Sequence, residues 1–290
     1  MTRLDGLGRS LVGVYCLPLP ATLPGTTRMA LADHDTYRTP PDRPRSLLAR
    51  LSPWPELAFY PPVLRIVLRS GRQAVRGAYD AEAWVRASLG IVRAMEAVGM
   101  RLTVEGMDHV RGLGGPAVFV GNHMSTLETF VLPSILQPVR PVTFVVKDTL
   151  LRYPVFGPVL RSRDPIAVGR DNPREDLRAV LDGGRDRLSR GISIIIFPQG
   201  IRSPAFDPAQ FNSIGVKLAA RAGVPVVPLA LRTDAWGSGR WLKDFGRVDP
   251  SLPVRFRFGA PLPPEDKGTQ AAVVRFIEEN LAAWGGLEDR

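Results

Sequence analysis

The chain has 290 residues, of which 44% are hydrophobic and 23% charged, and this composition is typical of a globular protein and excludes intrinsic disorder. A single cysteine, Cys16, excludes an intrachain disulfide framework, and one cysteine with three scattered histidines excludes a conventional zinc cluster. The formal net charge of +10 fits a protein that binds nucleic acid, an anionic membrane surface or an anionic substrate. The sequence contains no basic run interleaved with aromatic residues, so nothing in it favours binding to nucleic acid.

Residues 1–45 are rich in proline, threonine, aspartate and arginine, which predicts a flexible leader. Residues 46–100 are predicted to be helical, with an apolar face that is broken by Pro61 and Pro62 and flanked by arginines. This face fits either a membrane surface or the main domain as its packing partner. No stretch reaches the roughly 18 apolar residues needed to cross a bilayer. We therefore expect a cytoplasmic protein, peripheral on the inner face of the cell membrane.

From about residue 101 the pattern alternates between strands and helices. It predicts strands over 117–120, 142–146, 192–197, 224–231 and 254–258, and helices over 172–190, 213–222 and 269–284. Strands separated by helices of this length predict an α/β fold, with a largely parallel central sheet flanked by helices and an N-terminal helical membrane-docking segment. We expect this α/β domain to span residues 101–290.

A histidine stands in the turn after the first of these strands. His123 is followed, after four intervening residues, by Glu128. A neutral imidazole, with an ordinary pKa of about 6.5, can take a proton from a hydroxyl group, and a carboxylate on its other nitrogen would fix the tautomer. The alternative is that Ser125 and Glu128 form only a capping box at a helix start. The turn therefore predicts either a general base with its orienting carboxylate or a purely structural cap.

Arginines follow two other apolar runs. Arg170 stands just before a predicted helix, and Arg202 follows the strand predicted over 192–197. Ligand sites of α/β sheets gather at the carboxyl ends of the strands, so the two arginines and the histidine predict an anionic substrate held near a base. The alternative is that one arginine only pairs with a structural carboxylate such as Asp171 or Asp207.

Four segments together resemble the motifs of glycerolipid acyltransferases, the PlsC-type lysophosphatidic acid acyltransferase family. They are Asn122-His123 with Glu128, the block around Arg170, residues 197–203 and residues 224–228, in the family's order and approximate spacing. The resemblance covers roughly residues 85–265. It implies direct transfer of a fatty acyl chain from acyl-CoA or acyl carrier protein to a lysophospholipid or related lipid acceptor, through a hydroxyl or an amine, at a membrane surface and with no metal or other cofactor.

The resemblance also implies roles for single residues. His123 would be the general base, and Glu128 would orient it from the position of a family aspartate. Arg170 and Arg202 would bind the phosphate or polar head of the acceptor, Gly200 would give a tight turn, and Pro228 would end the strand of the fourth motif. The implied substrate-binding set is Asn122, Arg170, Gln199, Gly200, Arg202, Ser203 and Pro228.

Five positions depart from the family pattern. Glu128 replaces an aspartate, Gln199 a glutamate, Ile201 a threonine, Asp164 a glycine, and Asn212 a basic residue. Because a phosphomonoester benefits from every nearby cation, the missing cation at position 212 predicts an acceptor less charged than lysophosphatidate. Two alternatives to acyl transfer stay open: a non-catalytic or degenerate lipid-binding member of the family, and an acyl-thioester hydrolase.

Overall fold

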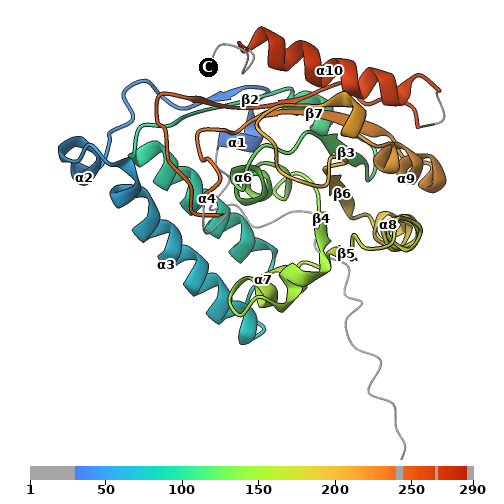
Figure 1. The fold of residues 1–290 in the computed structure, drawn as a ribbon, viewed down its shortest axis with the longest axis horizontal. Helices are drawn as coiled ribbons and strands as arrows, with labels where there is room; N and C mark the ends of the chain where they lie inside the picture. The colour runs from blue at the N-terminus through green and yellow to red at the C-terminus, as the bar shows by residue number, and fades with distance from the viewer. Residues whose placement is uncertain (1–29, 240–243, 265–266, 286–290) are drawn as a thin grey trace, which may run out of the picture.

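An eight-stranded sheet forms the centre of the computed structural model, which describes residues 30–239, 244–264 and 267–285 (Figure 1). In the described part of the chain five strand pairs are parallel, and only β1–β2 and β7–β8 are antiparallel. The strands, in their order across the sheet, are β1 (Tyr37–Arg38), β2 (Arg101–Glu105), β8 (Pro253–Phe258), β7 (Val226–Arg232), β3 (Val118–Gly121), β6 (Ser193–Ile196), β4 (Val142–Lys147) and β5 (Ile166–Val168). The predicted α/β fold with a largely parallel sheet is confirmed.

Helices cover both faces of this sheet. They are α1 (Ala30–Asp33), α2 (Leu47–Leu51), α3 (Pro55–Val75), α4 (Ala81–Ala97), α5 (Met107–Arg111), α6 (Leu127–Leu136), α7 (Phe156–Arg161), α8 (Pro173–Ser189), α9 (Ile214–Ala222) and α10 (Thr269–Ala283). Side chains that alternate along each strand enter two separate cores. Phe119 packs with residues of α4 and α6, whereas Val118 and Val120 pack with residues of α8, α9 and α10. Because β3 is buried on both faces, its side chains are almost entirely apolar.

The folded domain begins earlier than residue 46. Tyr37 Oη and Thr39 Oγ1 donate hydrogen bonds to Glu96 Oε1, at 2.7 and 2.9 Å, and Arg43 Nε donates to Glu96 Oε2 at 2.7 Å. Burial, reinforced by the hydrogen bond to Glu96, raises the pKa of Tyr37 to about 12, so the phenol keeps its proton. The expectation of a flexible leader is therefore wrong for residues 30–45, because a buried carboxylate of α4 holds them; residues 1–29, with Cys16, lie outside the described residues.

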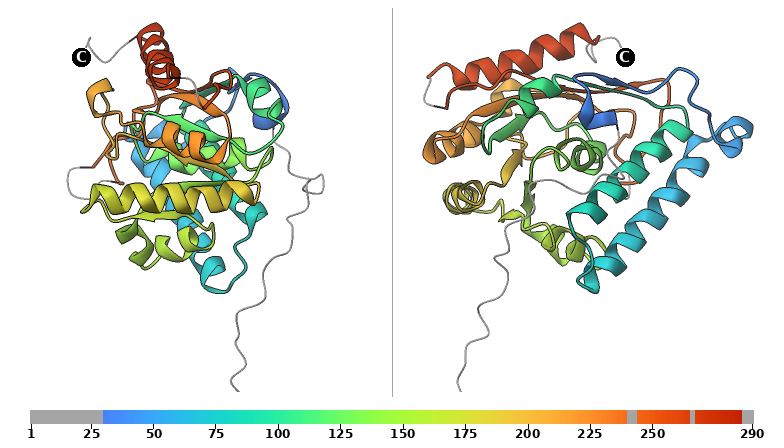
Figure 2. Two further views of the ribbon diagram at one scale, coloured as in Figure 1. Left: turned by 90° about the vertical axis from the view of Figure 1, so that its right-hand side faces the viewer. Right: turned by 180° about the vertical axis from the view of Figure 1, so that it is seen from behind.

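The helix α3 runs without interruption through Pro61 and Pro62. This corrects the expectation of a break there. Two prolines remove two backbone donors, but Phe59 and Val63 are buried in the core shared with α4, which lies beside α3 in Figure 1 and in the right-hand view of Figure 2. None of the described helices is both long enough and apolar enough to span a bilayer.

Candidate functional site

The histidine turn begins at an asparagine that ties two strands together. Asn122 is 1% exposed; its Nδ2 donates to the Leu231 carbonyl oxygen and its Oδ1 accepts from the Leu231 N–H, both at 2.8 Å. The amide therefore satisfies both backbone groups of one residue of β7. This corrects the expectation that Asn122 contacts substrate: it fixes the end of β3 against β7 and so sets where the next residue lies.

His123 and Glu128 form a hydrogen-bonded pair. The Nδ1 of His123 lies 2.7 Å from Oε1 of Glu128, whose side chain is fully buried. The same carboxylate accepts hydrogen bonds from the Met124 N–H at 2.8 Å, the Ser125 N–H at 3.0 Å and the Thr233 hydroxyl at 2.6 Å. Glu128 thus caps the turn and also contacts the imidazole.

The protonation of this pair follows from its surroundings. Burial alone would raise the pKa of Glu128, but the hydrogen bond and charge of His123 and the hydrogen bond from Thr233 outweigh it, and the pKa lies below the ordinary value of 4.5. An ionised carboxylate only accepts hydrogen bonds, so Nδ1 of His123 carries the proton. Whenever the ring is neutral, Nε2 is therefore the nitrogen without a proton, as a general base requires.

The loop after β6 holds the histidine turn in place. Gln199 Oε1 accepts a hydrogen bond from the His123 N–H at 2.8 Å, and the Ser203 N–H donates to the His123 carbonyl oxygen at 2.9 Å. The Phe197 ring stacks on the imidazole with 4.5 Å between ring centroids. Gly200 has a φ of +73°, which confirms the expected tight turn. Gln199 and Ser203 therefore position His123 through its backbone.

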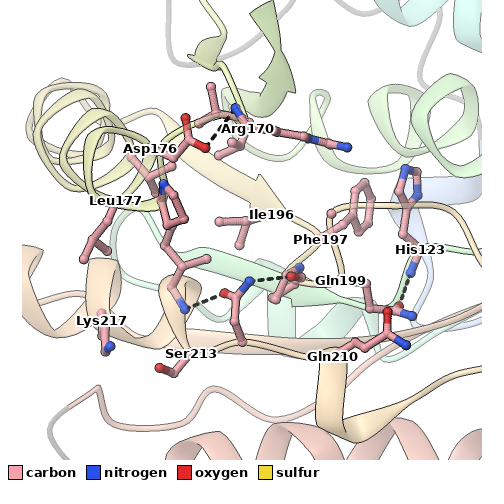
Figure 3. A pocket seen from close by; sticks show the side chains of 18 residues that line it. His123, Arg170, Asp176, Leu177, Ile196, Phe197, Gln199, Gln210, Ser213 and Lys217 are labelled. Carbon is pink, nitrogen blue, oxygen red and sulfur yellow. Dashed lines mark hydrogen bonds between the residues drawn. The ribbon is translucent and has the colours of Figure 1, made fainter.

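A cavity of about 530 Å³ opens beside His123, and Figure 3 shows its lining. It lies at the carboxyl ends of β5 and β6 and the starts of α8 and α9, as expected for a parallel sheet. Its polar lining residues are His123, Arg170, Asp176, Gln199, Gln210, Asn212, Ser213 and Lys217. Of the expected substrate-binding set, Arg170, Gln199 and Gly200 line this cavity, whereas Asn122, Arg202, Ser203 and Pro228 do not.

Arg170 reaches the cavity from an unusual backbone turn. Its φ of +69° is rare for a residue other than glycine, and the Asp176 carboxylate holds the turn by accepting the Gly169 N–H at 2.8 Å and the Arg170 N–H at 2.9 Å. The side chain extends toward the end of the cavity where His123 and Phe197 lie (Figure 3). Its guanidinium makes no hydrogen bond to any described residue, so it is available to an anionic ligand.

Arg202 is engaged elsewhere. Its Nη1 lies 2.7 Å from Asp244 Oδ1 and also donates to the Thr126 hydroxyl, which itself donates to Asp244 at 2.9 Å. The alternative of a structural carboxylate therefore describes Arg202, although its partner is Asp244 and not Asp171 or Asp207.

Two further residues have structural roles that the sequence did not indicate. Pro228 lies inside β7, not at its end, and its carbonyl oxygen accepts the Gly259 N–H at 2.9 Å just beyond β8. Asp164 has a φ of +49° and forms ion pairs with Arg187 and Arg190 of α8 and its C-cap. Nothing in the structure accounts for Ile201.

Sequence reasoning missed two cations at this edge. Lys217 of α9 lines the cavity. It stands four residues after Ser213, the predicted helix start, and this spacing could have indicated that both side chains lie on the same side of the helix. Lys147 ends β4, two residues after the cavity-lining Val145, and the strand-end rule applies to it as well. Among the described residues, no cluster of three or more His, Cys, Asp or Glu side chains is arranged to hold a metal ion.

Known proteins are similar to this chain in sequence. A family model described as acyltransferase matches residues 101–232. A 1-acyl-sn-glycerol-3-phosphate acyltransferase of Pseudomonas aeruginosa is 30% identical over 202 residues, 69% of this chain and 73% of that protein. The enzyme of the same description from Escherichia coli is 29% identical over 119 residues, 41% of this chain and 48% of that protein.

A solved structure has the same fold. The crystal structure of the 1-acyl-sn-glycerophosphate (LPA) acyltransferase PlsC from Thermotoga maritima is similar with a TM-score of 0.57 and 20% sequence identity. The similarity covers 79% of this chain and 94% of that one, and it concerns the fold.

Proposed function

This chain belongs to the family of 1-acyl-sn-glycerol-3-phosphate acyltransferases and is an acyltransferase, and on that premise we propose that it moves a fatty acyl chain from acyl-CoA or acyl carrier protein to the free hydroxyl of a lysophospholipid. The observation that carries this proposal is the His123–Glu128 pair at the wall of the cavity. A base held in one tautomer beside a cationic cavity suits an acceptor that carries both a hydroxyl and an anionic head.

The proposed reaction is a direct transfer. Nε2 of His123 removes the proton from the acceptor hydroxyl as its oxygen attacks the carbonyl carbon of the thioester. Glu128 stabilises the imidazolium that forms. The tetrahedral intermediate then expels the thiolate, which takes the proton from the imidazolium, so the products are an acylated lipid and a free thiol. No covalent bond to the enzyme is needed.

Two features argue against a degenerate, non-catalytic member. Glu128 is one methylene longer than aspartate, yet it reaches Nδ1 of His123 at 2.7 Å. Gln199 lacks the charge of glutamate, yet its oxygen supplies the acceptor that the His123 N–H needs. Both departures therefore preserve the contacts that hold the base in place.

A lysolipid panel with labelled acyl-CoA tests the proposal and separates it from thioester hydrolysis. Lysophosphatidate, a zwitterionic lysophospholipid and a lysolipid without phosphate are offered in turn, and acylated lipid and free fatty acid are both quantified. Acylated lipid is the expected main product with at least one lysophospholipid. Free fatty acid as the main product with every acceptor would assign the site to a hydrolase, and binding without turnover would support the degenerate alternative.

Arg170→Lys is expected to raise the acceptor KM by about tenfold or more, because the planar donor fork is lost while the charge stays, and a hydrogen bond to a charged group contributes roughly 1.5 to 3 kcal/mol. Arg202→Lys, the matched control, should change the acceptor KM much less, since Arg202 already pairs with Asp244. Kinetics with acceptor varied at saturating donor measure both. Equal effects of the two substitutions would contradict this division of roles.

We also propose that α3 docks on the inner face of the cell membrane. Leu57, Leu64, Leu68 and Val75 are separated by seven, four and seven residues, so at 3.6 residues per turn they form one stripe, and they are 40% to 73% exposed. Exposed arginines run beside this stripe at positions 65, 69, 72 and 76. An exposed apolar stripe next to a row of arginines suits the boundary between headgroups and acyl chains of anionic lipid.

The double substitution Leu64→Glu with Leu68→Glu is expected to weaken binding to anionic vesicles at least tenfold, since burying one leucine side chain contributes about 1.5 to 3 kcal/mol. Turnover of a short-chain, monomeric lysolipid should stay near that of the wild type. The charge-matched control is Ala271→Glu with Ala282→Glu on α10, which lies away from α3 (Figure 1). Vesicle co-sedimentation gives the answer, and equal losses in both double variants would reject α3 as the docking surface.

A further inference from the structure

The cavity holds a second cation at the end away from His123. Figure 3 shows Lys217 and Ser213 there, whereas Arg170 extends toward His123. The Lys217 side chain is exposed, and its ammonium group makes no hydrogen bond or ion pair with a described residue. Asp182 of the adjacent helix α8 is already paired with Arg221 at 3.0 Å. Lys217 therefore carries a charge that no described carboxylate compensates.

The surroundings of Lys217 add to its positive potential. Ser213 precedes α9 by one residue and Lys217 by four, so both side chains lie on the same side of the helix start. The Ser213 hydroxyl makes no capping hydrogen bond, and α9 has no acidic residue in its first turn. A lysine near the positive end of a helix is unfavourable unless an anion binds there. Asp176, whose carboxylate also lines the cavity, accepts hydrogen bonds from the backbone N–H groups of Gly169 and Arg170 and not from Lys217.

Asn212 has a structural role at this end. Its Nδ2 donates to the Pro198 carbonyl oxygen at 2.6 Å, and its Oδ1 accepts the Ile214 N–H at 3.0 Å. Asn212 thus connects the start of α9 to the loop after β6. Because Lys217 supplies a cation to the same cavity, the absence of one at position 212 is no longer a reason to expect an acceptor with a less charged head.

We propose that Lys217 and Ser213 form a phosphate-binding subsite at the end of the acyl-transfer cavity opposite His123. The ammonium and hydroxyl groups would donate hydrogen bonds to the oxygens of a phosphate ester. This inference rests on the proposed function, because each reactant of that reaction offers such a group: the head of the lysophospholipid, and the phosphopantetheine arm of the acyl donor.

Steady-state kinetics of Lys217→Met distinguish these two sources. The KM of one reactant should rise about tenfold or more with kcat little changed, since the lost contact is a charge-assisted hydrogen bond. A raised acceptor KM at saturating donor assigns the phosphate to the lysolipid head, and a raised donor KM at saturating acceptor assigns it to the donor. Lys217→Arg should retain most of the affinity. Arg221→Met, on the same helix but outside the cavity lining, should leave both KM values unchanged.

A binding measurement keeps this test separate from the proposed function. Calorimetric titration with coenzyme A and with glycerol 3-phosphate is performed on the wild type and on Lys217→Met. Weaker binding of either compound by the variant supports the subsite even if no lysolipid is acylated, an outcome that would reject only the proposed function. Unchanged KM values in an active enzyme, or equal affinities of the two proteins for both compounds, would overturn the subsite.

Discussion

Replacing His123 by alanine is expected to lower kcat by about 10²- to 10⁴-fold or more while the protein stays folded. A general base contributes typically that much to rate, and His123 is the imidazole whose Nδ1 contacts Glu128 at the cavity wall. The cost in stability should be about 1 kcal/mol, because Glu128 loses one donor but keeps those of Met124, Ser125 and Thr233. Turnover with labelled acyl-CoA and a denaturant titration measure the two effects.

The control for this substitution is His109→Ala. His109 Nδ1 lies 3.1 Å from the Phe258 carbonyl oxygen and does not line the cavity, so its loss should leave kcat close to that of the wild type. A folded His123→Ala protein with near wild-type turnover would eliminate the mechanism proposed here.

Glu128→Gln is expected to have the second largest effect, and to act on both rate and stability. The carboxylate faces donors only, so an amide NH₂ placed among them would oppose at least one. If that NH₂ faces Nδ1 of His123, it favours the wrong tautomer, a defect that lowers kcat by as much as about 10⁴-fold in a serine protease triad. Leaving buried donors unpaired should also lower the free energy of unfolding by about 1 to 3 kcal/mol.

Two measurements separate an orienting role of Glu128 from a merely structural one. Glu128→Asp keeps the charge and should restore part of kcat, whereas a group that only stabilises the fold would alter the free energy of unfolding and leave kcat per folded molecule unchanged. If Glu128→Gln retained wild-type kcat, the carboxylate would be a capping group alone.

The free energy of unfolding should also depend on pH through the ionisation of Glu128. The pKa of Glu128 in the folded protein lies below its ordinary value of 4.5, so its ionised form stabilises the fold fully above about that pH. This contribution is lost as pH falls through the folded pKa. The stability difference between the wild type and Glu128→Gln should therefore be constant near neutrality and shrink in acid below pH 4.5.

The alternating apolar pattern was enough to predict most of the sheet and the helices around it, because strands buried on both faces must be apolar along their whole length. It did not predict β1 or β2. β1 has only two residues, and β2 is buried on alternate residues, so neither gives a continuous apolar run. The attachment of residues 30–45 depends on Glu96, which lies more than fifty residues further along the chain.

The candidate site divides in the same way. His123 and Glu128 are five residues apart, so their contact is made within one turn, and the residue types and spacing indicated it as one of two alternatives. The roles of Arg170 and Arg202 could not be separated from sequence, since both are arginines at strand ends. Only the folded chain shows that Asp244 occupies one and leaves the other directed into the cavity.

The sequence by itself thus determined the fold class, the family and the pairing of His123 with Glu128, because these depend on periodicity, on the order of short motifs and on contacts between close neighbours. The tertiary structure alone decided which polar groups are already used. Asn122 is satisfied by Leu231, and Glu128 accepts a hydrogen bond from the Thr233 hydroxyl, more than one hundred residues away in each case. It also placed Lys217 in the cavity. Whether a polar side chain is hydrogen-bonded within the fold or available to a ligand depends on the partner that packing brings to it. A distant partner of this kind leaves no pattern in the neighbouring sequence.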